Sequence, residues 1–187
     1  MPDPIVPVET ERLLLRRFTP EDFEAFHGYH RLPEVARYLY RNPRTPEQSR
    51  AALERIGTLK FEGEGDELVL AVEARDGGAL LGEVLLKWVS REARQAEIGY
   101  IFAPEAGGRG YATEAARAML ALGFGRFGFH RIFARCDALN AGSINVLRRL
   151  GMRQEAHLIQ NDRFNGVWGD ELIFAMLQEE WARRVSG

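Results

Sequence analysis

The chain has 187 residues, 45% of them hydrophobic and 28% charged, which fits a globular protein with one full-sized core. Its net charge of -2 argues against a general affinity for nucleic acid, and no apolar run approaches the roughly 18 residues of a membrane helix. The N-terminus lacks a basic and then apolar signal, so we expect a cytoplasmic protein with no membrane partner.

The N-terminal part of the chain predicts an arm, a strand and three helices. Residues 1–8 contain three prolines and are expected to form a flexible arm, followed by one domain over 9–187. Residues 10–17 alternate enough to form a strand. Thr19 and Thr45 each precede a proline and an acidic residue, the pattern of a capped helix start. The second of these helices is expected to reach residue 61, and a shorter helix spans 32–40.

Three antiparallel strands are predicted next, over 68–74, 80–89 and 97–103. Asp76-Gly77-Gly78 supplies a hairpin turn between the first two. The third strand ends near Ala103 because Pro104 cannot donate to a ladder.

A glycine-rich turn joins the third strand to a long helix. Gly107, Gly108 and Gly110 lack Cβ atoms, so backbone N–H groups there can point outwards and an anion can approach them. The positive end of the helix dipole lies at the same place. The sequence therefore favours a phosphate-binding turn, and a turn that needs positive φ only for packing is the alternative. No lysine precedes Ser or Thr, which excludes a Walker loop, and a dinucleotide fingerprint fits only weakly.

The C-terminal part predicts a strand over 131–137, a helix over 143–150 and a hairpin of 157–160 with 172–177. Gly151 is the expected stop of the helix. The single cysteine, Cys136, lies in an apolar stretch and is predicted to be buried rather than nucleophilic. The four histidines show no ligand spacing, so we predict no metal. The element order indicates an α/β fold with a mixed, mostly antiparallel sheet flanked by helices.

Four segments occur in the order of a known enzyme family. They are TERLLLR at 10–16, GGRGYA at 107–112, Asn140 with Ser143, and RLGM at 149–152. GGRGYA matches the pattern [Q/R]-x-x-G-x-[G/A] at its fourth and sixth positions and departs from it at Gly107. The chain therefore resembles the GNAT superfamily of acyl-CoA-dependent N-acyltransferases, and within it the RimJ/RimL-like branch.

The resemblance implies a fold, a reaction and two substrates. The expected GNAT fold has a fourth and a fifth strand that splay apart around the pantetheine arm of acetyl-CoA, the cosubstrate. The acceptor would be a primary amine, either a protein N-terminal α-amine or a small amine, attacked in a ternary complex without a covalent intermediate. Homodimers are common in this branch, although no stretch of the sequence marks an interface.

The resemblance also assigns cofactor contacts. The amides of Gly108 to Ala112 would hold the pyrophosphate. Arg109 would add charge beside it, and an exposed arginine that only aids solubility is the alternative. Backbone groups of Phe102 and Ala103 would pair with pantetheine, and the Phe102 amide would stabilise the oxyanion. Asn140 would contact the pantetheine arm. The predicted cofactor-binding residues are Phe102, Ala103, Gly107, Gly108, Arg109, Gly110, Tyr111, Ala112, Asn140 and Ser143.

The catalytic residues are Glu97 and Ser143. Glu97 is the expected general base, and its alternative is a glutamate that only solvates the sheet. Many GNAT enzymes carry a tyrosine seven residues after the motif asparagine, where this chain has Leu147. Ser143 would then protonate the thiolate, unless it only caps a helix. Glu114 is interpreted as a capping residue of the long helix. Asp170 is favoured as an anchor of the last hairpin, and contact with the acceptor amine is its alternative.

Two other functions stay open. A CoA-binding sensor or interaction module without catalysis would explain why Leu147 and Arg135 stand where relatives carry acid-base groups. An enzyme that binds nucleotide phosphates could use the same glycine turn.

Overall fold

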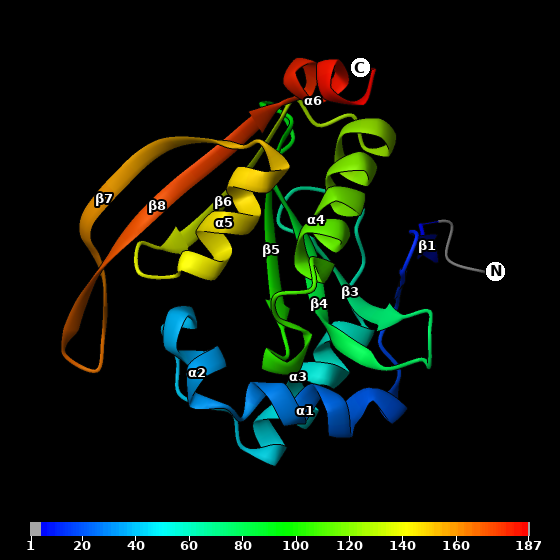
Figure 1. Ribbon diagram of the computed structural model, residues 1–187, viewed down its shortest axis with the longest axis vertical. Helices are drawn as coiled ribbons and strands as arrows, with labels where there is room; N and C mark the ends of the chain where they lie inside the picture. The colour runs from blue at the N-terminus through cyan, green and yellow to red at the C-terminus, as the bar shows by residue number, and fades with distance from the viewer. Residues whose placement is uncertain (1–4, 187) are drawn as a thin grey trace.

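The computed structural model describes residues 5–186, which contain one eight-stranded sheet with the order β1-β2-β3-β4-β5-β6-β8-β7 (Figure 1). Every neighbouring pair is antiparallel except β5 and β6, which run parallel and are joined by a helical crossover. The strands are β1 Val8–Glu9, β2 Leu13–Arg16, β3 Glu67–Ala74, β4 Leu80–Ser90, β5 Gln95–Phe102, β6 Arg131–Asp137, β7 Arg153–Phe164 and β8 Val167–Leu177.

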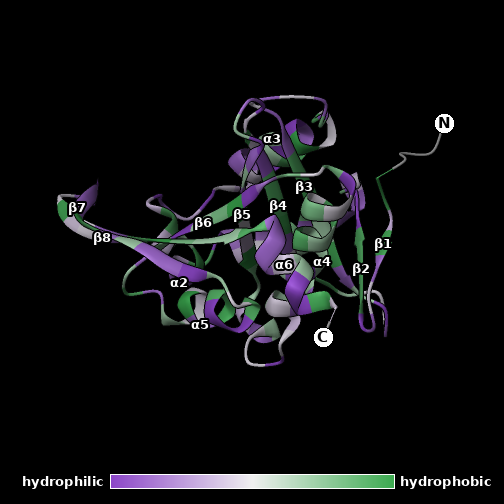
Figure 2. Ribbon diagram, turned by 90° about the horizontal axis from the view of Figure 1, so that it is seen from above, coloured by the Kyte–Doolittle hydropathy of each residue, from purple (hydrophilic) through white to green (hydrophobic). Residues whose placement is uncertain are grey.

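Helices lie on both faces of the sheet, with α3 on one side and α4 on the other (Figure 2). They are α1 Phe23–His30, α2 Pro33–Ala36, α3 Pro46–Gly57, α4 Tyr111–Ala121, α5 Ala141–Leu150 and α6 Gln178–Val185. Local sequence explains their ends. Thr45 caps α3 by accepting a hydrogen bond from the Gln48 N–H, and Gly151 ends α5 in the left-handed region at φ 81°.

The sheet is buried on both faces because its central strands are apolar on both. Leu68, Leu70 and Val72 of β3 belong to the core under α4 and α5, whereas Val69 and Ala71 belong to the core under α1 and α3. This alternation follows the two-residue period of a strand. The expected α/β architecture is therefore confirmed, with helices packed on two faces of a mostly antiparallel sheet.

β5 and β6 separate after a short parallel contact. Only three residue pairs join them, and the last is Glu97 with Phe133. Beyond that pair β5 continues to Phe102 alongside β4 alone, while β6 turns away (Figure 1). The splayed pair implied by the family resemblance is thus present in this chain.

Several elements differ from their predicted bounds. Residues 1–4 of the expected arm lie outside the described residues, but Ile5, Val6 and Val8 pack against the core and Val8 pairs with Leu15. The last hairpin is much longer than predicted, because β7 and β8 pair across irregular register shifts that interrupt the strand pattern. Helix α6 was not predicted. No helix among residues 5–186 is long and apolar enough to cross a membrane.

Candidate active site

Beyond Glu97, one edge of β5 is not paired with β6, and its backbone groups face the gap between these two strands. The Ala103 N–H donates to the Leu81 carbonyl at 2.9 Å, on the side of β4. Because successive residues direct their backbone groups to opposite edges, the Phe102 N–H faces the gap, as its predicted role requires. Ala103 differs, since its carbonyl also accepts from the Ala106 N–H at 3.0 Å. Both of its backbone groups are thus engaged within the protein, the carbonyl oxygen keeps one lone pair free, and the pairing of Ala103 with pantetheine stays a prediction.

The glycine turn leaves a row of main-chain donors free at the start of α4. No described residue accepts a hydrogen bond from the N–H groups of 108–113. Gly108 and Gly110 have φ angles of 72° and 83°, which glycine adopts without strain. Gly107 is different, because its N–H donates to the Pro104 carbonyl at 2.9 Å. Gly107 therefore shapes the turn, and the residues after it offer the amides that a pyrophosphate needs.

Glu114 ties the start of α4 to the segment before β2. Thr10 Oγ1 donates to Glu114 Oε1 at 2.6 Å, and Arg12 Nε donates to Oε2 at 2.7 Å. Arg12 Nη1 also donates to the Arg109 carbonyl at 3.0 Å, and its guanidinium lies 4.7 Å from the centre of the Tyr111 ring. Burial raises the pKa of Glu114, but the hydrogen bonds from Thr10 and Arg12 outweigh burial and leave that pKa below its ordinary value.

We call the contacts of Thr10 and Arg12 with Glu114 and the Arg109 carbonyl the clamp, and the sequence did not predict it. Sequence reasoning treated Glu114 as a helix cap and left Arg12 without a role. The available signal was the pair of matched motifs, TER at 10–12 and TEA at 113–115. Arg109, in contrast, is exposed, and its guanidinium lies 5.2 Å from the centre of the Tyr111 ring.

Asn140 and Ser143 lie at the start of α5, facing β5. Asn140 Oδ1 accepts from the Ser143 N–H at 3.0 Å, so Asn140 caps the helix and Ser143 is not its cap. Ser143 Oγ lies 3.0 Å from the hydroxyl of Tyr100 on β5. These three side chains line a cavity of about 360 Å³ that also reaches Phe102, Gly107, Gly108 and Ala112. The structure therefore gathers Ser143 and most of the predicted cofactor residues around one cavity.

Glu97 lies apart from that cavity. The two-residue period of β5 directs Glu97 and Tyr100 to opposite faces of the sheet. Glu97 Oε1 accepts from Arg135 Nε at 2.9 Å, at the point where β5 and β6 separate. Glu97 and Arg135 line a second cavity of about 590 Å³, which Ser143 does not border. The two predicted catalytic residues therefore approach the gap from opposite faces.

Three carboxylates gather around Tyr40 on the face that carries Glu97. Tyr40 Oη donates to Asp137 at 2.6 Å, and Asp137 on β6 is paired directly with Glu171 on β8. Burial raises the pKa of Glu171. Arg135 opposes this effect, and a hydrogen bond with Asp162 adds to the rise. Sequence reasoning missed this acidic group, because its members meet only through the register of β6, β8 and β7.

Asp170 has the structural role that the sequence favoured. Its Oδ2 lies 2.9 Å from His157 Nε2, and its Oδ1 accepts from the Gln160 N–H at 2.8 Å. These contacts hold β7 against β8 where the register is irregular.

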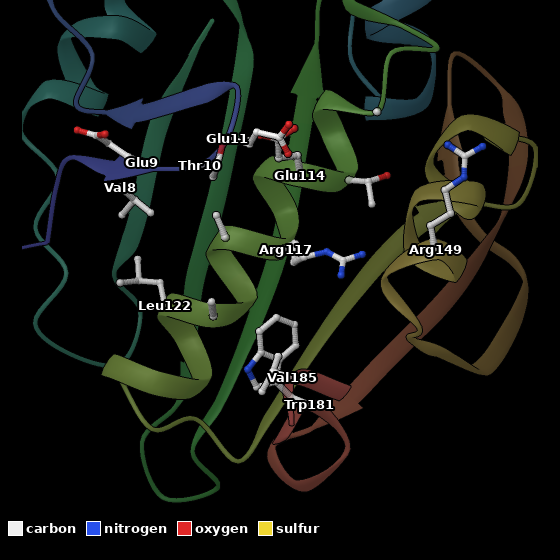
Figure 3. Close-up of a pocket in the computed structure, with 14 residues that line it drawn as sticks. Val8, Glu9, Thr10, Glu11, Glu114, Arg117, Leu122, Arg149, Trp181 and Val185 are labelled. Carbon is white, nitrogen blue, oxygen red and sulfur yellow. Dashed lines mark hydrogen bonds between the residues drawn. The ribbon is translucent and has the colours of Figure 1, made fainter. Parts of the chain in front are cut away.

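A larger groove of about 730 Å³ follows the outer side of α4 (Figure 3). Thr10, Glu114 and Trp181 are among its lining residues. It contains neither Ser143 nor Glu97, so volume alone does not locate the predicted chemistry. Gly110 and Arg149 border both this groove and a smaller cavity at the glycine turn. Among the described residues, no group of three or more His, Cys, Asp or Glu is placed to hold a metal ion.

Comparison with other proteins places this geometry in a wider group. YnaD of Bacillus subtilis, described as an uncharacterised N-acetyltransferase, is 33% identical over 174 residues, or 93% of this chain and 98% of its own. Spermidine N(1)-acetyltransferase of Escherichia coli is 25% identical over 167 residues, or 89% of this chain and 87% of its own.

Solved structures share the fold. An acetyltransferase of the GNAT family from Bacillus anthracis has a TM-score of 0.84 and 31% identity, covering 94% of this chain and all of its own. Spermidine N-acetyltransferase from Vibrio cholerae, in complex with CoA and spermine, has a TM-score of 0.78 and 22% identity, covering 92% of this chain and 99% of its own. The family model for the acetyltransferase (GNAT) domain matches residues 12–153. The chain therefore has the GNAT fold, is an acyltransferase and belongs to the family of GNAT acetyltransferases.

Proposed function

We propose that this chain transfers an acetyl group from acetyl-CoA to a primary amine on a molecule that carries further positive charge. The observation that carries the proposal is the row of free N–H groups at 108–113 beside the gap between β5 and β6. A pyrophosphate suits that row, and the pantetheine arm would then run past Asn140 towards Ser143. The CoA complex of the related Vibrio cholerae enzyme supports the same cosubstrate.

The reaction needs three services from the protein. The Phe102 N–H would stabilise the oxyanion that forms when the amine attacks the thioester carbonyl. Glu97 would accept the proton that the amine loses, directly or through water, and it must release Arg135 to do so. The Ser143 hydroxyl would donate to the thiolate that leaves when the C–S bond breaks. Glu97 then releases its proton to solvent, and solvent replaces the hydrogen that Ser143 gives to sulfur, so one proton leaves nitrogen, one reaches sulfur and both side chains are restored.

The acidic group supports a cationic acceptor. Burial is the largest cause that raises the pKa of Tyr40. Three nearby carboxylates add to this rise, and they belong to Asp137, Asp162 and Glu171. Arg135 is a cation beside this acidic group. Its hydrogen bond to Glu97 raises its pKa, and the charge of Glu171 adds to the rise. A polyamine matches this excess of negative charge, and the Escherichia coli and Vibrio cholerae relatives are spermidine acetyltransferases. The RimJ/RimL-like motifs support a peptide α-amine as the second acceptor class.

The test is release of CoA thiol from acetyl-CoA with a panel of amines. We expect spermidine and spermine to accelerate release more than a neutral peptide with a free N-terminus. Faster release with the peptide would transfer the proposal to the second class. If CoA binds in calorimetry and no amine accelerates release, the chain is a CoA-binding module and the enzymatic proposal fails.

A further inference from the structure

Tyr100 makes a contact that no part of the proposed reaction yet uses. Its hydroxyl lies 3.0 Å from Ser143 Oγ and 3.2 Å from the Ser143 carbonyl oxygen. Tyr100 belongs to β5 and Ser143 to α5, so the contact joins the strand to the helix that follows β6 in the chain. Both residues line the cavity that Asn140 and the glycine turn border. The tyrosine hydroxyl is therefore adjacent to the group that would meet the leaving sulfur.

The direction of this contact decides its effect on Ser143. Tyr100 has one hydroxyl hydrogen and two nearby acceptors, of which Ser143 Oγ is closer than the carbonyl oxygen. Burial raises the pKa of Tyr100, so its hydroxyl keeps its hydrogen. Either hydroxyl can donate in the contact with Oγ. When Tyr100 donates to Ser143 Oγ, the serine hydrogen is left free to turn elsewhere.

Ser143 has one hydroxyl hydrogen, and that hydrogen can reach the cavity only while Tyr100 acts as the donor of their contact. Ser143 lines the cavity together with Asn140 and the glycine turn. A sulfur atom bound in this cavity would therefore be an acceptor for the serine hydrogen.

We propose that Tyr100 is a positioning residue, whose hydroxyl fixes Ser143 so that the serine hydrogen points at the departing CoA sulfur. This inference rests on the proposed acetyl transfer. When the amine nitrogen bonds to the thioester carbon and the C–S bond breaks, sulfur keeps the electron pair and Ser143 donates to it. The arrangement replaces the tyrosine that relatives carry at the position of Leu147, which is fully buried in the core here.

Kinetics of Tyr100→Phe test the proposal. The substitution removes one oxygen, and we expect kcat to fall about tenfold, the effect of one hydrogen bond, with KM for acetyl-CoA unchanged. In a Ser143→Ala background, Tyr100→Phe should have no further effect on kcat. Tyr29→Phe is the matched control, since Tyr29 is buried and donates to Glu83 far from Ser143. It should lower thermal stability and leave kcat alone. An unchanged kcat, or additive losses in the double variant, would overturn the proposal.

A binding measurement separates this inference from acetyl transfer itself. Desulfo-CoA lacks the thiol, so the ratio of CoA to desulfo-CoA affinity reports on the sulfur alone. We expect this ratio to rise between pH 7 and pH 9.5 in the wild type, because a donor favours the thiolate, and to rise about tenfold less in Tyr100→Phe. If both proteins show the same ratio, Tyr100 has no positioning role although CoA still binds. If CoA does not bind the wild type, the proposed function and this inference both fail.

Discussion

Gly108 combines two requirements in one residue. Its φ of 72° favours glycine, and a Cβ added there would meet no heavy atom within 4 Å. Asparagine and aspartate tolerate this backbone region better than other side chains do. Gly108→Asn and Gly108→Asp therefore impose similar strain and similar volume, and only the aspartate adds a negative charge beside the free amides.

We expect Gly108→Asp to bind CoA about thirtyfold more weakly than Gly108→Asn, because the carboxylate repels the pyrophosphate by about 2 kcal/mol. Calorimetry with CoA gives both affinities, and circular dichroism verifies that both variants fold. Equal affinities would mean that no phosphate lies at this turn.

Cys136 provides a residue-scale prediction that needs no ligand. Because burial raises its pKa to about 11, little thiolate exists at pH 8. Iodoacetamide should alkylate the folded chain about a hundredfold more slowly than the urea-unfolded chain. Mass spectrometry measures both rates. Comparable rates would show that the gap beside Ser143 opens to solvent.

At the scale of elements, the glycine turn depends on a segment about a hundred residues away in sequence. Arg12 bonds both to Glu114 and to the Arg109 carbonyl, so it restrains the turn against the first turn of α4. Lysine cannot reproduce this forked contact. Arg12→Lys should therefore weaken CoA binding about threefold to tenfold while changing the melting temperature little, since 44% of the side chain is exposed.

Arg55→Lys is the control, because Arg55 forms an exposed ion pair with Glu67 away from α4. Hydrogen exchange should increase at residues 107–113 in Arg12→Lys and nowhere in Arg55→Lys. If hydrogen exchange at residues 107–113 is unchanged in both variants, the turn is rigid without the Arg12 contacts and the prediction is wrong.

Elements with strong local signals were predictable from sequence, and those that depend on tertiary register were not. The strand over 131–137 and the starts at Thr19 and Thr45 match, because hydrophobic period and proline position are local. The long hairpin of β7 and β8 did not match, because exposed polar residues alternate poorly there. The glycine turn was predictable from its motif. The acidic group around Tyr40 was not, since three separate strands bring it together.

At the scale of the whole molecule, the splay of β5 and β6 gives the sheet two faces that meet at one gap. The face under α4 and α5 offers amides and hydroxyls, and the opposite face offers carboxylates. The acidic face has an energetic consequence. Glu171 is buried among like charges and its pKa is raised, so the folded chain binds a proton there more tightly than the unfolded chain does. Its ionisation therefore destabilises the fold as pH rises above the ordinary carboxyl pKa.

Glu171→Gln should consequently melt at a higher temperature than the wild type at pH 7.5, and the difference should shrink as pH falls towards 4, where the wild-type carboxyl is protonated. The amide keeps the shape and supplies Asp162 with a permanent donor. Glu179→Gln, which removes the same charge from an exposed position on α6, should not change the melting temperature. If the acidic group binds a cationic acceptor, Glu171→Gln should also raise KM for spermidine several-fold, and a gain in stability would accompany a loss of function. A lower melting temperature at pH 7.5 would instead mean that the Arg135 pair outweighs the repulsion.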